Sequence, residues 1–205
     1  MTQKQSEIVA ELLGQHGQTY AEQAGITLRD KPSALYRLLV LATLLSTRIN
    51  ADLAVDAARE LSRAGWRTPR AMLESTWQQR VDALGRAHYK RYDESTATRL
   101  AEGAQLLLER YGGDLRRLRD EADGDVHRIH DLLMQFPGIG PTGARIFCRE
   151  AQGVWPELRP YFDERAIARA ADLGLPSTPP RLGRLVADRE LTRLSAALVR
   201  SALAG

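Results

Sequence analysis

A turn rich in glycine and proline, at residues 133–144, carries the clearest chemical signal in the sequence. It reads Leu-Met-Gln-Phe-Pro-Gly-Ile-Gly-Pro-Thr-Gly-Ala. Gly138 and Gly140 permit backbone conformations and close approaches that a Cβ would block, and Pro141 suits the first turn of a following helix. The free N–H groups of such a turn and of a helix N-terminus form an anion site that can hold a phosphate. The alternative is an ordinary connection between two helices, in which glycine and proline only interrupt the chain.

Other candidate groups are fewer. Asp163 precedes a helical pattern, where an aspartate accepts hydrogen bonds from the free N–H groups of the helix as an N-cap. His127 and His130 are three residues apart, but no carboxylate or cysteine partner is evident near them, so we expect solvated histidines and no metal site. Cys148 is the only cysteine, which excludes an intramolecular disulfide and any site that needs four cysteines of this chain.

The elements that must position these residues are helices. Apolar residues recur at helical spacing along nearly the whole chain, and no segment shows the sustained alternation of a strand. Clusters of Gly, Pro and Asp separate the helical patterns, most clearly at residues 112–114, 137–141 and 176–180. The fold class is therefore all-α. Helices are expected at residues 8–20, 35–45, 53–61, 77–84, 100–111, 126–136, 143–151, 164–173 and 188–204.

The composition favours a nucleic-acid partner weakly. The net charge is only +3, but the basic residues comprise 26 Arg and 3 Lys, and arginine suits bidentate contacts with phosphates and bases. A coding bias toward arginine and alanine is an equal alternative. No apolar run approaches the roughly 20 residues that span a bilayer, and the first residues lack the pattern of a secretory signal. We expect a cytoplasmic protein of 205 residues with one two-lobed domain or two small domains.

Three segments, in order, resemble the helix-hairpin-helix DNA glycosylase superfamily and its endonuclease III branch. Residues 136–144 follow the hairpin pattern Leu-Pro-Gly-Val-Gly with a Thr and an Ala behind it. Residues 38–52 look like the early helix that ends in Leu-Leu-Ser-Ala-Gln before a helix led by Asp. Residues 160–169 lie where the superfamily has Val-Asp-Thr-His and a helix. The resemblance covers about residues 35–175, which is most of the chain.

The resemblance implies a two-lobed helical fold with the lesion cleft between the lobes. Residues 35–154 would form the lobe that carries the helix-hairpin-helix, and residues 1–34 and 155–205 would form the second lobe, which carries the candidate catalytic aspartate. The hairpin would bind the DNA backbone without reading its sequence. The residues expected to do so are Gly138, Gly140, Thr142, Gly143 and Ala144.

Asp163 falls on the position of the family's catalytic aspartate. Breaking the bond between base and sugar builds positive charge on the deoxyribose, so a carboxylate beside the ring stabilises the transition state and can orient the attacking water. A simple N-cap is the alternative for Asp163. Arg48 falls where the family fills the space left by the extruded base, and the alternative there is a solvated cation near a helix end.

Aromatic residues near these positions are candidates for stacking on an extruded base. They are Tyr161 and Phe162, which precede the aspartate, and His88 and Tyr89, which lie in a basic aromatic segment. Each is equally consistent with a residue of the core or of a pocket rim, which is the commoner location for an aromatic side chain.

The sequence departs from the family in two places. Bifunctional members carry a lysine after the hairpin glycines that forms a Schiff base with the sugar, and the matching residue here is Thr142, whose hydroxyl cannot form that imine. Lys90 is a weak substitute amine, with a surface loop as its alternative. The four cysteines that close the endonuclease III chain are also absent, so we expect apolar packing by Leu191, Leu194 and Leu198 to hold the terminal lobe.

The leading functional hypothesis is a monofunctional DNA repair glycosylase that hydrolyses the N-glycosidic bond of a damaged or mismatched base. The alternatives are a non-catalytic protein that binds damaged or abasic DNA through the hairpin, and an abasic-site lyase with an atypical amine. The expected partner is double-stranded DNA, bound by a nucleoid-associated monomer with no membrane contact. No cofactor is implied, and a structural ion at the hairpin remains open. Neither residue types nor spacing indicate which lesion is recognised.

Overall fold

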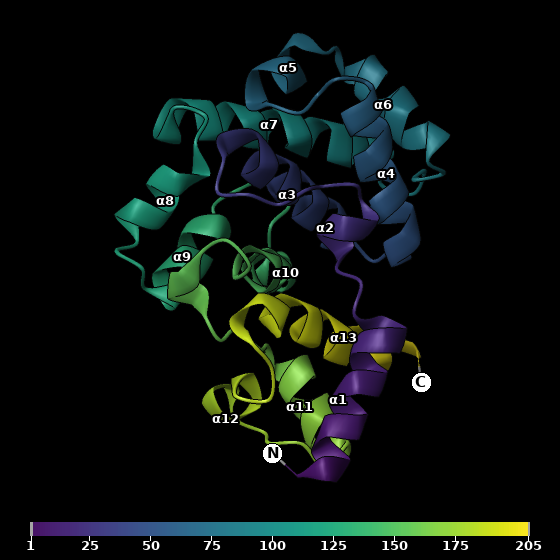
Figure 1. The fold of residues 1–205 in the computed structure, drawn as a ribbon. Coiled ribbons are helices and arrows are strands. Elements are labelled where there is room, and N and C mark those ends of the chain that lie inside the picture. Colours follow the sequence, from purple (N-terminus) through teal and green to yellow (C-terminus); the bar gives the residue numbers. More distant parts are fainter. Residues whose placement is uncertain (1, 205) are drawn as a thin grey trace. The chain divides into compact units, whose positions relative to one another are not determined.

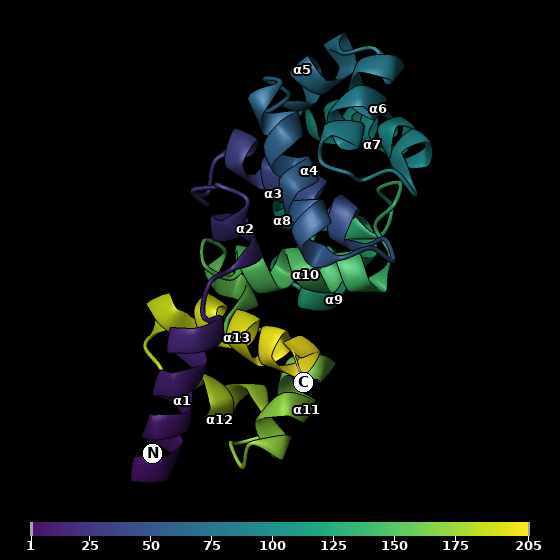
Figure 2. The same ribbon diagram turned by 90° about the vertical axis from the view of Figure 1, so that its right-hand side faces the viewer.

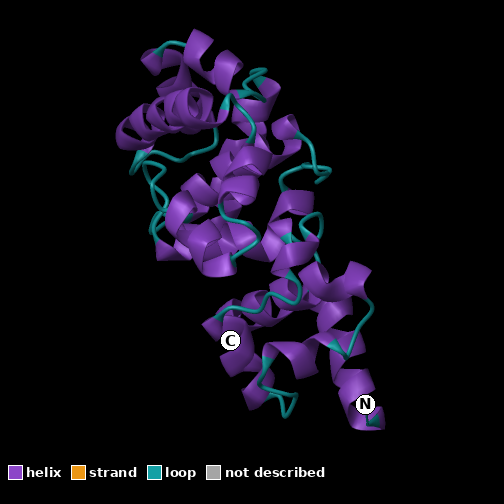
Figure 3. Ribbon diagram, turned by 90° about the vertical axis from the view of Figure 1, so that its left-hand side faces the viewer, coloured by secondary structure: helices purple, strands orange, loops and turns teal. Residues whose placement is uncertain are grey.

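The structure, a computed structural model, describes residues 2–204, and within that range it contains helices and loops but no strand (Figures 1 and 3). The predicted all-α fold class is confirmed. Contacts along the chain define two units. The central unit comprises Gln23–Phe147, and the terminal unit comprises the described residues up to Glu22 and from Cys148 onward. None of the described helices is both long and apolar enough to cross a bilayer.

The central unit is built on one apolar helix. Nine of the residues of α3 (Pro32–Leu45) are buried, and it packs against α4 (Ala51–Arg63), α7 (Asp93–Tyr111) and α8 (Leu115–Glu121). The remaining helices are α5 (Pro69–Glu74), α6 (Trp77–Arg86), α9 (Val126–Leu133) and the first part of α10 (Pro141–Ala151). Side-chain N-caps begin most of them, because a free oxygen there satisfies N–H groups that have no partner in the helix. The capping residues are Asn50, Thr68, Thr76, Asp114 and Asp125.

A buried arginine fixes α5 and α6 to α7. Arg80 donates from Nε to the carbonyl of Ala97 at 2.9 Å and from Nη1 to the carbonyl of Ser75 at 2.7 Å. These carbonyls are hydrogen-bond partners that a buried guanidinium needs to offset its lost hydration. Arg80 therefore has a role inside the scaffold, and it is not one of the cations available to a ligand.

In the terminal unit, α13 (Leu191–Ala204) packs against α1 (Gln3–His16) and α11 (Glu164–Asp172) (Figures 1 and 2). Leu191, Leu194 and Leu198 are buried in this core, so an apolar helix packs at the C-terminal end as predicted. The shorter elements are α2 (Tyr20–Gln23), the 3₁₀ turn η1 (Pro156–Leu158), α12 (Pro179–Gly183) and the 3₁₀ turn η2 (Asp188–Glu190).

Several boundaries differ from the sequence prediction. The first helix ends at His16 rather than at residue 20, and α9 ends at Leu133, so that Phe136 lies in the turn. The short helices α2, α5, α8 and α12 were not predicted. Pro179 begins α12 inside a stretch that was interpreted as a break, because proline is tolerated in the first turn of a helix.

The units also divide at different places from the predicted lobes. The predicted divisions follow residues 34 and 154, whereas the contacts divide the chain after Glu22 and after Phe147. The second division falls inside α10, so this helix begins in the central unit and ends in the terminal unit.

Candidate functional site

The glycine- and proline-rich turn is a tight hairpin between α9 and α10. The N–H of Phe136 donates to the carbonyl of Leu133, and the N–H of Ile139 donates to the carbonyl of Phe136, each at 3.0 Å. Helix α10 then starts with Pro141 at its first position. The predicted hairpin therefore lies where the sequence pattern placed it, entirely within the central unit.

The hairpin glycines have different physical roles. Gly138 has a φ of +86°, and a Cβ there would lie 3.1 Å from both Arg99 Cδ and Thr43 Cγ2. A Cβ on Gly143 would overlap the hydroxyl oxygen of Ser46. Both glycines therefore let the hairpin pack on the C-terminal end of α3. Gly140 differs, because its φ is not positive and a Cβ there would meet no atom within 4 Å.

Free backbone donors remain at the start of α10. No acceptor among residues 2–204 takes the N–H of Gly140, Thr142 or Gly143, and Thr142 is exposed. The expected donor Ala144 is different, because it is buried and its N–H donates to the carbonyl of Gly140 at 3.0 Å. Ala144 is thus a helix residue and not a phosphate donor. Gly143 is also buried, against α3, so the N–H groups of Gly140 and Thr142 are the ones that suit an anion site at a helix N-terminus.

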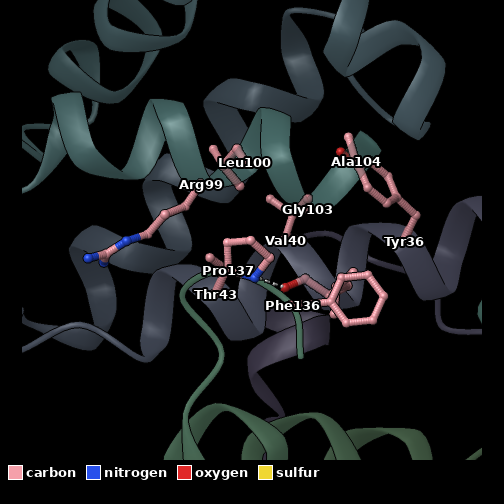
Figure 4. A pocket seen from close by; sticks show the side chains of 10 residues that line it. Tyr36, Val40, Thr43, Arg99, Leu100, Gly103, Ala104, Phe136 and Pro137 are labelled. Atoms are coloured by element: carbon pink, nitrogen blue, oxygen red, sulfur yellow. Dashed lines mark hydrogen bonds between the residues drawn. The ribbon is translucent and has the colours of Figure 1, made fainter. Parts of the chain in front are cut away.

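A small pocket lies beside the hairpin, between α3 and α7 (Figure 4). Pro137, Phe136 and Thr43 face it, and the side chain of Arg99 extends away from it with the guanidinium at the far end. The aliphatic part of the Arg99 side chain also borders Gly138. Most of the side chains that line the pocket are apolar, and they come from α3, α7 and the hairpin, so the hairpin is seated closely on α3.

The turn after α3 joins the hairpin to a basic segment at residues 87–92. Thr47 Oγ1 and the Tyr89 hydroxyl are 2.6 Å apart and share a hydrogen bond. Arg48, the next residue, is exposed and makes no ion pair or hydrogen bond within the described range. His88 and Lys90, which flank Tyr89, are also exposed, and His88 has a φ of +58°. The structure therefore gathers the hairpin, Arg48 and this basic segment around one end of α3.

Two of the candidate stacking residues prove to be core residues. The side chain of Tyr89 is 0% exposed, its hydroxyl also reaches the carbonyl of Leu44 at 3.4 Å, and burial raises its pKa. Phe162 is buried in the core of the terminal unit. Neither ring has a face open to an extruded base, so the alternative location in the core holds for both. Tyr161 is half-buried and His88 is exposed.

Asp163 is the N-cap of α11, and each of its carboxylate oxygens accepts one hydrogen bond. Oδ1 accepts from the N–H of Ala166 at 3.0 Å, and Oδ2 accepts from Nη1 of Arg149 at 2.8 Å. The side chains of Asp163 and Arg149 are 7% and 3% exposed. A buried ion pair of this kind is strongly coupled, because each charge lacks water to replace its partner.

Arg149 belongs to a group of polar side chains at the end of α10 that sequence reasoning missed. Glu150 is fully buried and accepts from the N–H groups of Tyr20 at 3.3 Å and Ala21 at 3.0 Å. Burial raises the pKa of the Glu150 carboxyl. Gln152 is also buried. No local pattern distinguishes these residues from the many exposed charges of the chain, because their partners lie far away in sequence.

Gln152 holds the loop that leads to Asp163. The Tyr161 N–H donates to Gln152 Oε1, and Gln152 Nε2 donates to the Tyr161 carbonyl, both at 3.0 Å. Arg159 adds a hydrogen bond from Nε to the Gln152 carbonyl at 2.6 Å. The backbone before Asp163 is therefore tied to the C-terminal end of α10.

The remaining candidates belong to the central unit. His127 is exposed and His130 is half-buried on α9, where burial lowers the pKa of His130. No group of three or more His, Cys, Asp or Glu side chains within the described range is placed to hold a metal ion. Lys90 lies in the central unit, whereas Asp163 lies in the terminal unit.

Comparisons with known proteins rest on the fold. No protein-family model and no curated protein matches the chain. Two solved structures of endonuclease III with DNA do match it. One is a trapped covalent intermediate in an estranged-adenine complex, with 17% identity and a TM-score of 0.55. The other is a non-covalent complex, with 18% identity and a TM-score of 0.57. Each alignment covers 97% of this chain and 85% of the other. The chain therefore has the all-helical fold of endonuclease III.

Proposed function

We propose that this protein binds double-stranded DNA through its hairpin and hydrolyses the N-glycosidic bond of a damaged or mismatched base. Water adds its hydroxyl to the sugar C1′, the bond from C1′ to the base nitrogen breaks, and the base leaves with a proton. The product is an abasic site in an uncut strand. A water molecule and a carboxylate are sufficient for this reaction, so the proposal includes no cofactor.

Backbone binding is supported by the central unit. The net positive charge of the chain belongs to this unit, because acidic and basic residues balance in the terminal unit. The free N–H groups of Gly140 and Thr142 suit a phosphate. A Cβ on Gly140 would meet no atom of the protein within 4 Å, so packing does not require a glycine at this position. Arg48 supplies an unpaired cation on the adjoining turn. Both solved endonuclease III neighbours are complexes with DNA.

The observation that carries the proposed chemistry is the carboxylate of Asp163, held by two donors at the start of α11. Its position after the hairpin matches the aspartate of the resembled family. An oriented carboxylate stabilises the positive charge that develops on the sugar. About four acceptor positions exist on a carboxylate, so two remain for a water molecule or the sugar.

The reaction should stop at base removal. Thr142 occupies the position of the family's nucleophilic lysine, and a hydroxyl cannot form a Schiff base. Lys90 is exposed in the segment beside Arg48. We therefore propose a monofunctional glycosylase that acts as a monomer.

The test is base release from labelled duplexes that carry uracil, hypoxanthine, alkylated, oxidised or mismatched bases. Wild type and Asp163→Asn are compared with and without alkali, which cuts the strand at abasic sites. Asp172→Asn is the matched control, because Asp172 is an exposed aspartate at the end of the same helix. We expect an alkali-dependent product from wild type and Asp172→Asn only. Strand cleavage without alkali would instead indicate a lyase.

The ion pair favours one second candidate, a protein that binds damaged or abasic DNA without reacting. Arg149 neutralises Asp163, and only 7% of the Asp163 side chain is exposed. The pairing weakens the electrostatic effect of the carboxylate on a substrate, and the low exposure limits direct contact with one. This candidate predicts tight binding to a damaged duplex, retained in Asp163→Asn, with no base released by either protein.

A further inference from the structure

The buried ion pair at the end of α10 identifies a residue that neither the hairpin nor the sequence pattern indicated. Arg149 and Asp163 are 14 residues apart in the chain and meet at 2.8 Å, through Nη1 and Oδ2. Both belong to the terminal unit. Arg149 is 3% exposed, so its guanidinium is closed off from solvent and from any surface ligand. Its function must therefore be exerted on a neighbouring group.

Donors from two different elements hold the Asp163 carboxylate. The Ala166 N–H, in the first turn of α11, binds Oδ1 at 3.0 Å, and Arg149, on α10, binds Oδ2. With one donor alone, the carboxylate could rotate about its bond to Cβ and keep that hydrogen bond with either oxygen. The second donor removes this freedom, because each oxygen is then bound separately.

Arg149 is itself held by its surroundings. Its carbonyl accepts from Gln152 Nε2 at 3.0 Å, and the same side-chain amide brackets the backbone of Tyr161. Its guanidinium carbon lies 5.9 Å from the centre of the Tyr20 ring, which is within the range of a cation–π contact. Residues at the end of α10 therefore fix both the backbone conformation before Asp163 and the orientation of the Asp163 side chain.

We propose that Arg149 is a positioning residue that holds the Asp163 carboxylate in its reactive orientation. The inference rests on the proposed glycosylase function and extends it to a residue that contacts no substrate. Misplacing a reacting group by about 1 Å can cost on the order of a hundredfold in rate. Loss of Arg149 should therefore slow base removal by the bound enzyme and leave the affinity for DNA unchanged, because the hairpin lies in the other unit.

The contact is a single hydrogen bond between Nη1 and Oδ2 and not a bidentate pair. A lysine ammonium can make one such bond with the same charge, whereas methionine fills similar volume without a donor. Glutamine offers a neutral donor. The series Arg149→Lys, Arg149→Gln and Arg149→Met therefore separates positioning from packing.

The experiment measures single-turnover base release at saturating enzyme, the Kd for an uncleavable duplex and the melting temperature of each variant. Arg189→Met, which removes an exposed arginine on η2, is the control. We expect Arg149→Met to lose at least about tenfold in rate with a Kd within roughly twofold of wild type. Arg149→Lys should recover most of the rate, and Arg189→Met should match wild type.

A folded Arg149→Met protein with the wild-type rate would overturn the inference, and so would a rate loss that lysine does not relieve. If Arg149→Met does not fold, Arg149→Lys and Arg149→Gln decide the question: a rate per folded molecule near wild type in Arg149→Lys supports the inference, and a loss in Arg149→Lys as large as in Arg149→Gln overturns it. Wild-type protein that releases no base refutes the proposed function, and the inference with it. Base release that is insensitive to Arg149 refutes the inference alone.

Discussion

Asp163→Asn should destabilise the protein strongly, although asparagine is as good an N-cap as aspartate. Asparagine can still accept a hydrogen bond from the Ala166 N–H, so the stability that is lost is that of the ion pair with Arg149. Arg149 would remain 3% exposed without its anion. Breaking a buried pair by removing one partner costs about 3–5 kcal/mol. For a chain of this size that corresponds to a fall in Tm on the order of 10 °C.

Urea denaturation of wild type, Asp163→Asn, Arg149→Met and the double variant measures this effect. The double variant should be more stable than the sum of the single losses predicts, because it leaves no unpaired charge in the site. We expect a coupling free energy in the range of about 0.5–3 kcal/mol that is typical of residues in contact. Asp172→Asn, an exposed change on the same helix, should leave the unfolding free energy within about 0.5 kcal/mol of wild type.

An Asp163→Asn protein as stable as wild type would refute the reasoning, and so would single losses that simply add. The result also governs how activity is interpreted. Loss of base release in Asp163→Asn has a chemical meaning only at a temperature where that variant is folded. Rates should therefore be compared well below its melting transition.

Three further predictions concern other parts of the molecule. Gly143→Ala should lose about 1–3 kcal/mol of stability, because its Cβ would overlap Ser46 Oγ. Urea denaturation should show that the double variant Gly143→Ala/Ser46→Ala recovers this stability. A double variant that is no more stable than Gly143→Ala would contradict the packing of Gly143 on Ser46. Gly140→Ala should keep wild-type stability, because its Cβ meets nothing within 4 Å, and should weaken duplex binding in a titration; unchanged binding would remove Gly140 from the interface. Burial raises the pKa of Glu150 above its ordinary value of 4.5, so its contribution to stability is present below that value and falls as pH rises through the folded pKa. Glu150→Gln should therefore gain stability relative to wild type as pH rises from about 4.5, and a difference in unfolding free energy that is independent of pH would contradict this.

Much of the fold could be predicted from local patterns. Helical periodicity indicated an all-α chain, and the Gly-Pro pattern placed the hairpin between α9 and α10. An aspartate before a helical pattern predicted the N-cap at Asp163. Short helices such as α5 were missed, because one or two turns contain too few residues to establish a period.

The candidate site was less predictable, because its decisive contacts join residues distant in the chain. The sequence did not distinguish Gly138 and Gly143, which pack against α3, from Gly140, which packs against nothing. The sequence also left open whether Tyr89 lies in the core. Tyr89 is buried, and its hydroxyl shares a hydrogen bond with Thr47, which is 42 residues away in the chain.

The sequence by itself determined the helical class, the hairpin and the start of α11, because each depends on interactions among residues a few positions apart. Only the tertiary structure decided that Arg149 is buried and that its cation lies against Asp163. Among 26 arginines, the buried ones, Arg80 and Arg149, are selected by which side chains the packed helices bring together. Burial and pairing are properties of that packing, so no stretch of sequence carries them alone.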